Sequence, residues 1–209
     1  MRRSRHERDD REHAPSSLSS AVAELESPGA KKFRTARNLI ALSEKDPSAL
    51  VPFFDDFRRL MGAENKIIKW SVYQIIANLA CADRRGRIAA ILDEYLAPIK
   101  GPAMVTAANA IRGGAKIAAA HEGLAPRIAS AILGVERARY KTAECRNVAI
   151  GHAVTALESM GDDVKRPARV VAFVKRQTRN RRAGTRKKAE AFLMRIRGET
   201  SRGAHLAPR

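Results

Sequence analysis

The densest group of chemically active side chains is a basic run in the last quarter of the chain. Residues 165–188 contain 11 Lys and Arg and no Asp or Glu. Guanidinium groups offer paired N–H donors to phosphate oxygens, and such contacts bind nucleic acid largely without sequence preference. The run therefore predicts a surface for nucleic acid or another polyanion. A solvated polar cap at the end of the fold is the alternative explanation that the sequence leaves open.

Basic residues elsewhere could extend this surface. Helical spacing would place Lys175, Arg179 and Arg182 on one stripe. Lys69 and Arg146 fall on helices expected earlier in the chain and could continue the footprint, although every soluble helix needs a polar face. The predicted nucleic-acid-binding residues are Lys165, Arg166, Arg169, Lys175, Arg176, Arg179, Arg181, Arg182, Arg186, Lys187, Lys188, Arg146 and Lys69.

The charge of the whole chain favours the same kind of partner. Its 40 basic and 22 acidic residues give a net charge of +18, and residues 145–209 contribute +11 from 16 basic and 5 acidic residues. No apolar run reaches the roughly 20 residues that a transmembrane helix needs, so no membrane partner is expected. The charged N-terminus lacks an apolar signal segment, which favours a cytoplasmic location.

Other side chains with catalytic or ligand-binding potential are sparse. Trp70 and Tyr73 are three residues apart and could stack on bases, although such a pair more often packs in a core. Cys81 and Cys145 are too far apart for a metal knuckle and are expected to be buried as small apolar side chains. No glycine-rich phosphate loop, Ser-His-Asp set or carboxylate pair stands out, so no catalytic residue, metal or cofactor is predicted.

Helices must position these residues, because apolar side chains recur at helical spacing from residue 31 onward. The clearest case is residues 67–99, where a polar turn joins two apolar stripes. About nine helices are expected, with no convincing strand. Leu42, Leu79, Ile117 and Leu157 recur late in alternate helices at intervals of 37, 38 and 40 residues. Periods near 40 with two helices per unit are typical of a helical solenoid.

The expected fold is therefore all-α. It is a right-handed solenoid of helical hairpins, with about four and a half helix pairs over residues 31–197. Residues 1–30 mix charges with serines and prolines and are expected to form a disordered tail with a short helix near residues 20–26. Residues 198–209 are expected to form a flexible C-terminal tail.

The chain resembles the HEAT/armadillo-like helical repeat superfamily over roughly residues 31–197. Residues 50–80, LVPFFDDFRRLMGAENKIIKWSVYQIIANLA, are similar to one such unit: a helix that opens near a proline, a short polar turn and a second helix. The resemblance implies that the second helices line a concave binding face. A comparable basic position in successive second helices holds Arg34, Lys69, Arg146 and Arg186, whereas Thr106 lies near that place in the third unit.

We therefore predict a non-enzymatic binding module whose basic C-terminal surface docks nucleic acid or another polyanion. The alternative is a scaffold that grips a partner helix or peptide on its concave face. A more remote alternative is a DNA glycosylase of the HEAT-like kind, and resemblance to those enzymes would require an acidic residue among several aromatics in a cleft. Aromatic residues make up only 5% of the chain, and no acidic residue is clearly framed by them.

Overall fold

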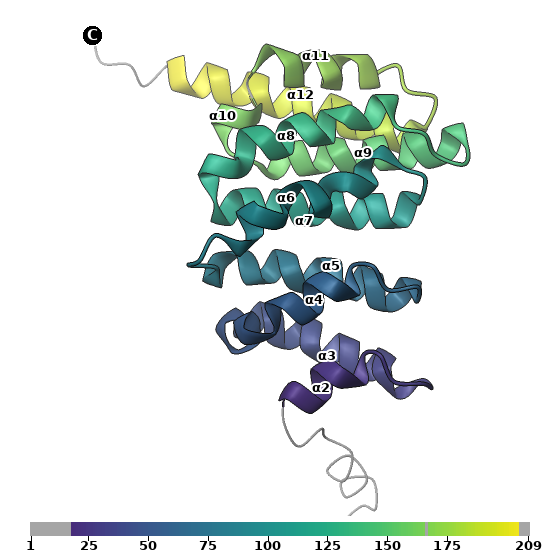
Figure 1. Cartoon of the computed structure of the whole chain (residues 1–209). Coiled ribbons are helices and arrows are strands. Elements are labelled where there is room, and N and C mark those ends of the chain that lie inside the picture. The colour runs from purple at the N-terminus through teal and green to yellow at the C-terminus, as the bar shows by residue number, and fades with distance from the viewer. Residues whose placement is uncertain (1–17, 166, 205–209) are drawn as a thin grey trace, which may run out of the picture.

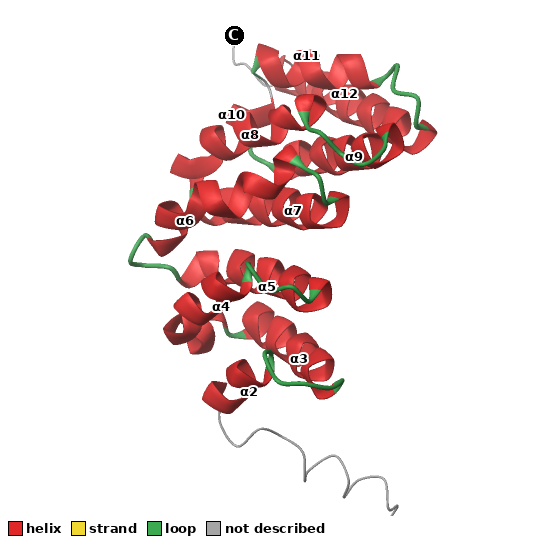
Figure 2. Cartoon of the chain, turned by 45° about the vertical axis from the view of Figure 1, so that its right-hand side comes forward, coloured by secondary structure: helices red, strands yellow, loops and turns green. Residues whose placement is uncertain are grey.

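The computed structural model describes residues 18–165 and 167–204, and these ranges contain helices and no strand (Figure 2). The prediction of an all-α fold is confirmed. Short 3-10 segments extend or precede several of the α-helices. The α-helices are α2 (Leu18–Glu24), α3 (Lys31–Lys45), α4 (Phe54–Leu60), α5 (Lys66–Leu79), α6 (Arg87–Leu96), α7 (Met104–Ala120), α8 (Ala125–Leu133), α9 (Ala143–Ser159), α10 (Asp162–Lys165), α11 (Ala168–Gln177) and α12 (Ala183–Ala204).

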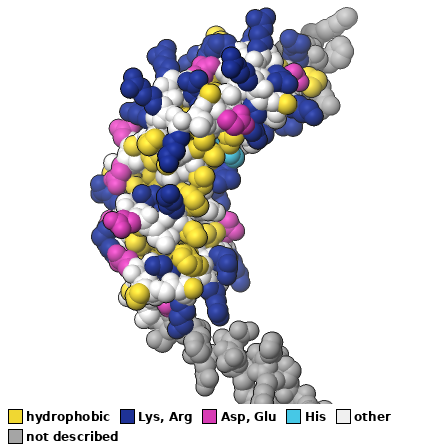
Figure 3. All heavy atoms as spheres, turned by 90° about the vertical axis from the view of Figure 1, so that its right-hand side faces the viewer, with side chains coloured by type: hydrophobic (Ala, Val, Ile, Leu, Met, Phe, Trp, Pro, Cys, Tyr) yellow, Lys and Arg dark blue, Asp and Glu magenta, His cyan; other side chains and the backbone are white. Residues whose placement is uncertain are grey.

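The helices form two layers that are stacked along one axis (Figure 1). One layer contains the longer helices α3, α5, α7, α9 and α12, each of which contacts the next in that order. We call these the inner helices. Shorter helices return the chain between them, so the inner helices all run in the same direction. The stack is curved, and the inner helices lie on its hollowed side (Figures 2 and 3).

Side-chain caps fix where several helices begin. The Asn65 side chain accepts hydrogen bonds from the backbone N–H groups of the first turn of α5, and Thr142 does the same for Cys145 in α9. Such caps satisfy N–H groups that have no partner within the helix. These two inner helices therefore start at positions that are encoded locally, immediately after a polar residue.

Polar side chains join neighbouring inner helices through a largely apolar core. Asn78 of α5 donates to the Ser43 hydroxyl of α3 at 2.7 Å, and both side chains are buried. The Thr185 hydroxyl of α12 donates to the Asn147 carbonyl of α9 at 2.9 Å. A buried amide or hydroxyl costs free energy if it lacks a partner, so these contacts favour one register between the helices.

The folded region extends beyond both predicted boundaries. Helix α2 lies close to the short helix expected at residues 20–26, but it belongs to the folded region, because Ala21, Val22 and Leu25 form a short apolar stripe that is buried in the core beside α3. Helix α12 continues to Ala204, past the end predicted at residue 197. The remaining tail predictions, for residues 1–17 and 205–209, lie outside the described residues. Of the helices described, none is both long and apolar enough to cross a bilayer.

Candidate polyanion-binding face

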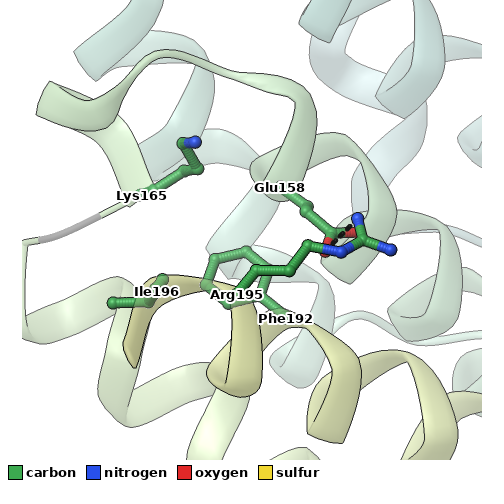
Figure 4. A pocket seen from close by; sticks show the side chains of 5 residues that line it. All are labelled: Glu158, Lys165, Phe192, Arg195 and Ile196. Atoms are coloured by element: carbon green, nitrogen blue, oxygen red, sulfur yellow. Dashed lines mark ion pairs between the residues drawn. The ribbon is translucent and has the colours of Figure 1, made fainter. Parts of the chain in front are cut away.

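The structure divides the basic run between two places. Helix α11 ends at Gln177 and α12 begins at Ala183, so the run wraps around a helical hairpin. Lys165 lies beside the second half of α12, where it lines a pocket with Phe192, Ile196 and the Arg195–Glu158 ion pair (Figure 4). The basic residues just before and within the first turns of α12 lie about 6 to 20 Å from Phe192 and Ile196 along that helix. The predicted residues are therefore spread along the length of α12, and Arg166 lies outside the described residues.

Several predicted site residues have structural partners instead. Arg176 forms an ion pair with Glu136, at 2.7 Å between Nη2 and Oε2, and this contact raises the pKa of the guanidinium group. Arg182 pairs with Glu144 of α9. Lys165 pairs with Asp162 at 3.1 Å between Nζ and Oδ1. Since a carboxylate already lies against each of these cations, they are weaker candidates for phosphate binding. Arg169 donates a hydrogen bond from Nη2 to the Pro126 carbonyl oxygen at 3.5 Å.

The predicted stripe of Lys175, Arg179 and Arg182 is wrong, because a turn separates the third residue from α11. Asn180 organises that turn: its side chain receives the backbone N–H of Arg182 at 2.9 Å. Arg186 donates from Nη1 to the carbonyls of Asn180 and Arg181 and so closes the loop. Arg186 therefore stabilises the turn through these two hydrogen bonds, while the side chain of Arg181 remains exposed.

Three cationic or titratable side chains converge on the hollowed side from neighbouring inner helices. They are Arg112 of α7, His152 of α9 and Lys188 of α12. Burial lowers the pKa of His152, and the positive charges of Arg112, Lys188 and Arg182 lower it further. Arg112 donates to Asn109 Oδ1 at 2.9 Å, and the Lys188 ammonium lies 3.4 Å from the Gly151 carbonyl. Within the described ranges, neither Arg112 nor Lys188 has a carboxylate at ion-pair distance. Sequence reasoning missed His152 because its cationic neighbours lie about 40 residues away in each direction.

The first turns of the inner helices all lie along one edge of the stack, which faces the viewer in Figure 3. Arg146 and Lys187 are exposed in the first turns of α9 and α12, and Lys69 is half-buried in the first turn of α5. The structure therefore brings Arg146 next to the start of α12, whereas Lys69 lies two inner helices further along. We define the basic face as Lys69, Arg112, Arg146, Arg181, Lys187 and Lys188.

Charge is divided unequally between the two layers. The central inner helices α5 and α7 contain four basic residues and no Asp or Glu in 31 positions. The outer helices α4 and α6 behind them carry four acidic residues, which are nearly balanced by Arg58, Arg59 and Arg87. The hollowed side at the centre of the stack is therefore cationic. The residues that carry this contrast are Lys66, Lys69, Arg112 and Lys116 on the inner helices and Asp55, Asp56, Asp93 and Glu94 on the outer ones.

No family model matches the chain. No curated protein matches its sequence. The resemblance to HEAT and armadillo repeats therefore stays a prediction, and any function has to be argued from the geometry itself. In the ranges that the structure covers, no three His, Cys, Asp or Glu side chains are grouped so that they could hold a metal ion.

The aromatic pair on α5 divides between two environments. Tyr73 is 3% exposed, and its ring lies 4.9 Å from that of Tyr95. Burial raises the pKa of Tyr73 to about 12. Trp70 is only half-buried, and its indole N–H donates to Thr106 of α7 at 3.1 Å. Cys81 is exposed rather than buried, and Cys145 is partly exposed, because both lie near helix ends beyond the core-facing stripe.

Proposed function

We propose that the chain is a HEAT-like solenoid without catalytic activity that docks nucleic acid on its basic face. The inner helices are the second helices of the repeated units. In support, Leu42, Leu79, Ile117 and Leu157 occur late in α3, α5, α7 and α9, at the spacing that a repeat requires. The curvature of the stack gives these helices a hollow into which a partner can dock.

The charge contrast between the layers is the observation that carries this proposal. Like charges gathered without carboxylates repel one another, and an anionic ligand relieves that repulsion. Arg112, Arg181, Lys187 and Lys188 are free of carboxylate partners among the described residues, whereas Arg176 and Arg182 are neutralised. The outer helices α4 and α6, by contrast, are nearly neutral, with four acidic and three basic residues.

The proposal is tested by binding measurements with labelled single- and double-stranded oligonucleotides at about 50 and 200 mM salt. Each phosphate contact contributes about 0.7 to 0.9 to the slope of log K against log salt. Lys187→Gln with Lys188→Gln should therefore weaken binding and flatten this slope by about 1.5.

A matched control removes the same charge from the other edge of the stack. Arg84 and Arg85 are exposed in the turn before α6, so Arg84→Gln with Arg85→Gln should leave affinity unchanged. The proposal fails if no oligonucleotide binds at low salt, or if both double variants lose affinity equally. Capture of a protein partner that resists nuclease treatment, without nucleic-acid binding, would favour the scaffold function.

A further inference from the structure

Two exposed apolar side chains lie near the starts of the neighbouring inner helices α5 and α7, and we call them, together with Trp70, the apolar patch. Ile67 is 49% exposed and Val105 is 40% exposed, and they are two of the four large hydrophobic side chains that are exposed among the described residues. Ile67 lies one turn before Trp70 on the same helix stripe. Val105 directly precedes Thr106, whose hydroxyl receives the indole N–H. The patch is therefore centred on Trp70.

Trp70 is held in a fixed orientation while part of its ring remains accessible. The hydrogen bond to Thr106 ties its polar edge to α7, so the ring does not rotate freely. A fixed aromatic surface loses little conformational entropy when a planar ligand stacks on it. Tyr73, one turn further along, is buried and cannot serve in this way.

Cations surround this patch. Lys66 and Lys69 belong to the first turn of α5, and Arg112 lies on α7 within two turns of Thr106. The Asn109 side chain lies between the patch and the cation, accepting from Arg112 and donating to the Val105 carbonyl at 2.9 Å. The apolar patch, the Asn109 amide and the Arg112 guanidinium group are therefore linked by hydrogen bonds along α7.

We propose that the patch binds an unpaired base of a single-stranded nucleic acid, with Trp70 as the stacking surface and the surrounding cations on the flanking phosphates. The inference rests on the proposed function and specifies the form of its ligand. A single strand presents both the base faces and the phosphates that this arrangement complements. A duplex hides its base faces in the stack and would leave the apolar patch uncovered. A purely anionic polymer has no bases and would also leave the apolar patch uncovered.

Intrinsic fluorescence tests the inference without any variant, because Trp70 is the only tryptophan of the chain. Titration of the full chain with oligo(dT) should quench its emission as binding proceeds. A duplex of equal length and inorganic polyphosphate should bind the basic face without that quenching. Trp70→Leu should weaken oligo(dT) binding by about fivefold or more, and should leave polyphosphate binding unchanged.

Two further variants separate stacking from structure. Trp70→Phe keeps an aromatic ring and should retain most of the affinity that Trp70→Leu loses. Thr106→Val removes the hydrogen-bond acceptor but not the ring, and should weaken oligo(dT) binding less than Trp70→Leu does. Oligo(dT) binding that neither quenches Trp70 nor depends on it would overturn this inference and leave the proposed function intact. Tighter binding of duplex, insensitive to Trp70→Leu, would overturn it too. Failure of all three polyanions to bind would instead refute the proposed function.

Discussion

Replacement of Gly113 by alanine should destabilise the protein, although alanine is the better helix former. A Cβ atom at this position would lie 1.8 Å from the Tyr95 hydroxyl oxygen, 2.9 Å from Tyr95 Cζ and 3.1 Å from Ala77 Cβ. Tyr95 is 1% exposed and donates to the Tyr73 carbonyl at 2.8 Å, so its ring has no space into which it can move. The α5–α7 contact must therefore open or the hydrogen bond must break.

The expected cost follows from three contributions. Overpacking of a close-packed core costs about 1–3 kcal/mol. Loss of the Tyr95 hydrogen bond adds about 1 kcal/mol, and the better helix propensity of alanine returns about 1 kcal/mol. The net loss is about 2 kcal/mol, which corresponds to a fall of about 4–8 °C in Tm for a domain of this size.

Urea unfolding followed by circular dichroism measures this loss, with Gly198→Ala as the matched control. Gly198 lies in α12, and a Cβ atom at this position would meet nothing within 4 Å, so alanine there should stabilise by about 0.5 kcal/mol. Tyr95→Phe removes the closest atom and should restore part of the stability lost in Gly113→Ala. If Gly113→Ala were as stable as the wild type, the close packing of α5, α6 and α7 would be refuted.

Three further predictions concern the titration of His152 and the capping of α6. The lowered pKa of His152 means that the unfolded chain binds more protons than the folded one, so the free energy of unfolding should fall as pH drops through about 6.5. His152→Gln should lose less stability than the wild type between about pH 7 and pH 5. Parallel plots of unfolding free energy against pH for the two proteins would contradict the inference. A bound polyanion should raise the His152 pKa in an NMR titration, because it screens the neighbouring cations. Asp83 is 7% exposed, receives the backbone N–H of Ile88 at 2.7 Å and faces Arg87 at 3.7 Å. Asp83→Ala should therefore cost about 2 kcal/mol in thermal or urea unfolding, and a loss below about 0.5 kcal/mol would show that the cap is unimportant.

Helix periodicity was sufficient to predict the all-α class of the fold. Ile68, Val72, Ile75 and Leu79 form the buried stripe of α5 that the sequence predicts, because one-sided burial requires apolar residues at helical spacing. A short helix was expected near residues 20–26, but the sequence did not indicate that its apolar stripe would be buried beside α3. Short isolated helices have little stability of their own, so tertiary contacts decided that element.

The arrangement of the basic run could not be predicted, because its partners are distant in the sequence. Glu136 precedes Arg176 by 40 residues, and Glu144 precedes Arg182 by 38. Each carboxylate therefore reaches the hairpin from an element that precedes it in the stack of helices. Local spacing shows which side chains are basic, but the packing of distant helices determines which of them are neutralised. The exposure of Trp70, and the burial of Tyr73 one turn later, depends in the same way on the position of α7.

The common direction of the inner helices has an electrostatic consequence for how a ligand approaches. Each α-helix carries about half a positive charge at its N-terminus and half a negative charge at its C-terminus. At the edge where the five inner helices begin, their N-terminal partial charges are largely offset by the C-terminal ends of the outer helices, which run in the opposite direction. Arg146, Arg181 and Lys187 lie on that edge, so the side chains rather than the backbone supply its positive charge. An approaching polyanion is therefore oriented before contact, and its association rate constant should fall steeply as ionic strength rises.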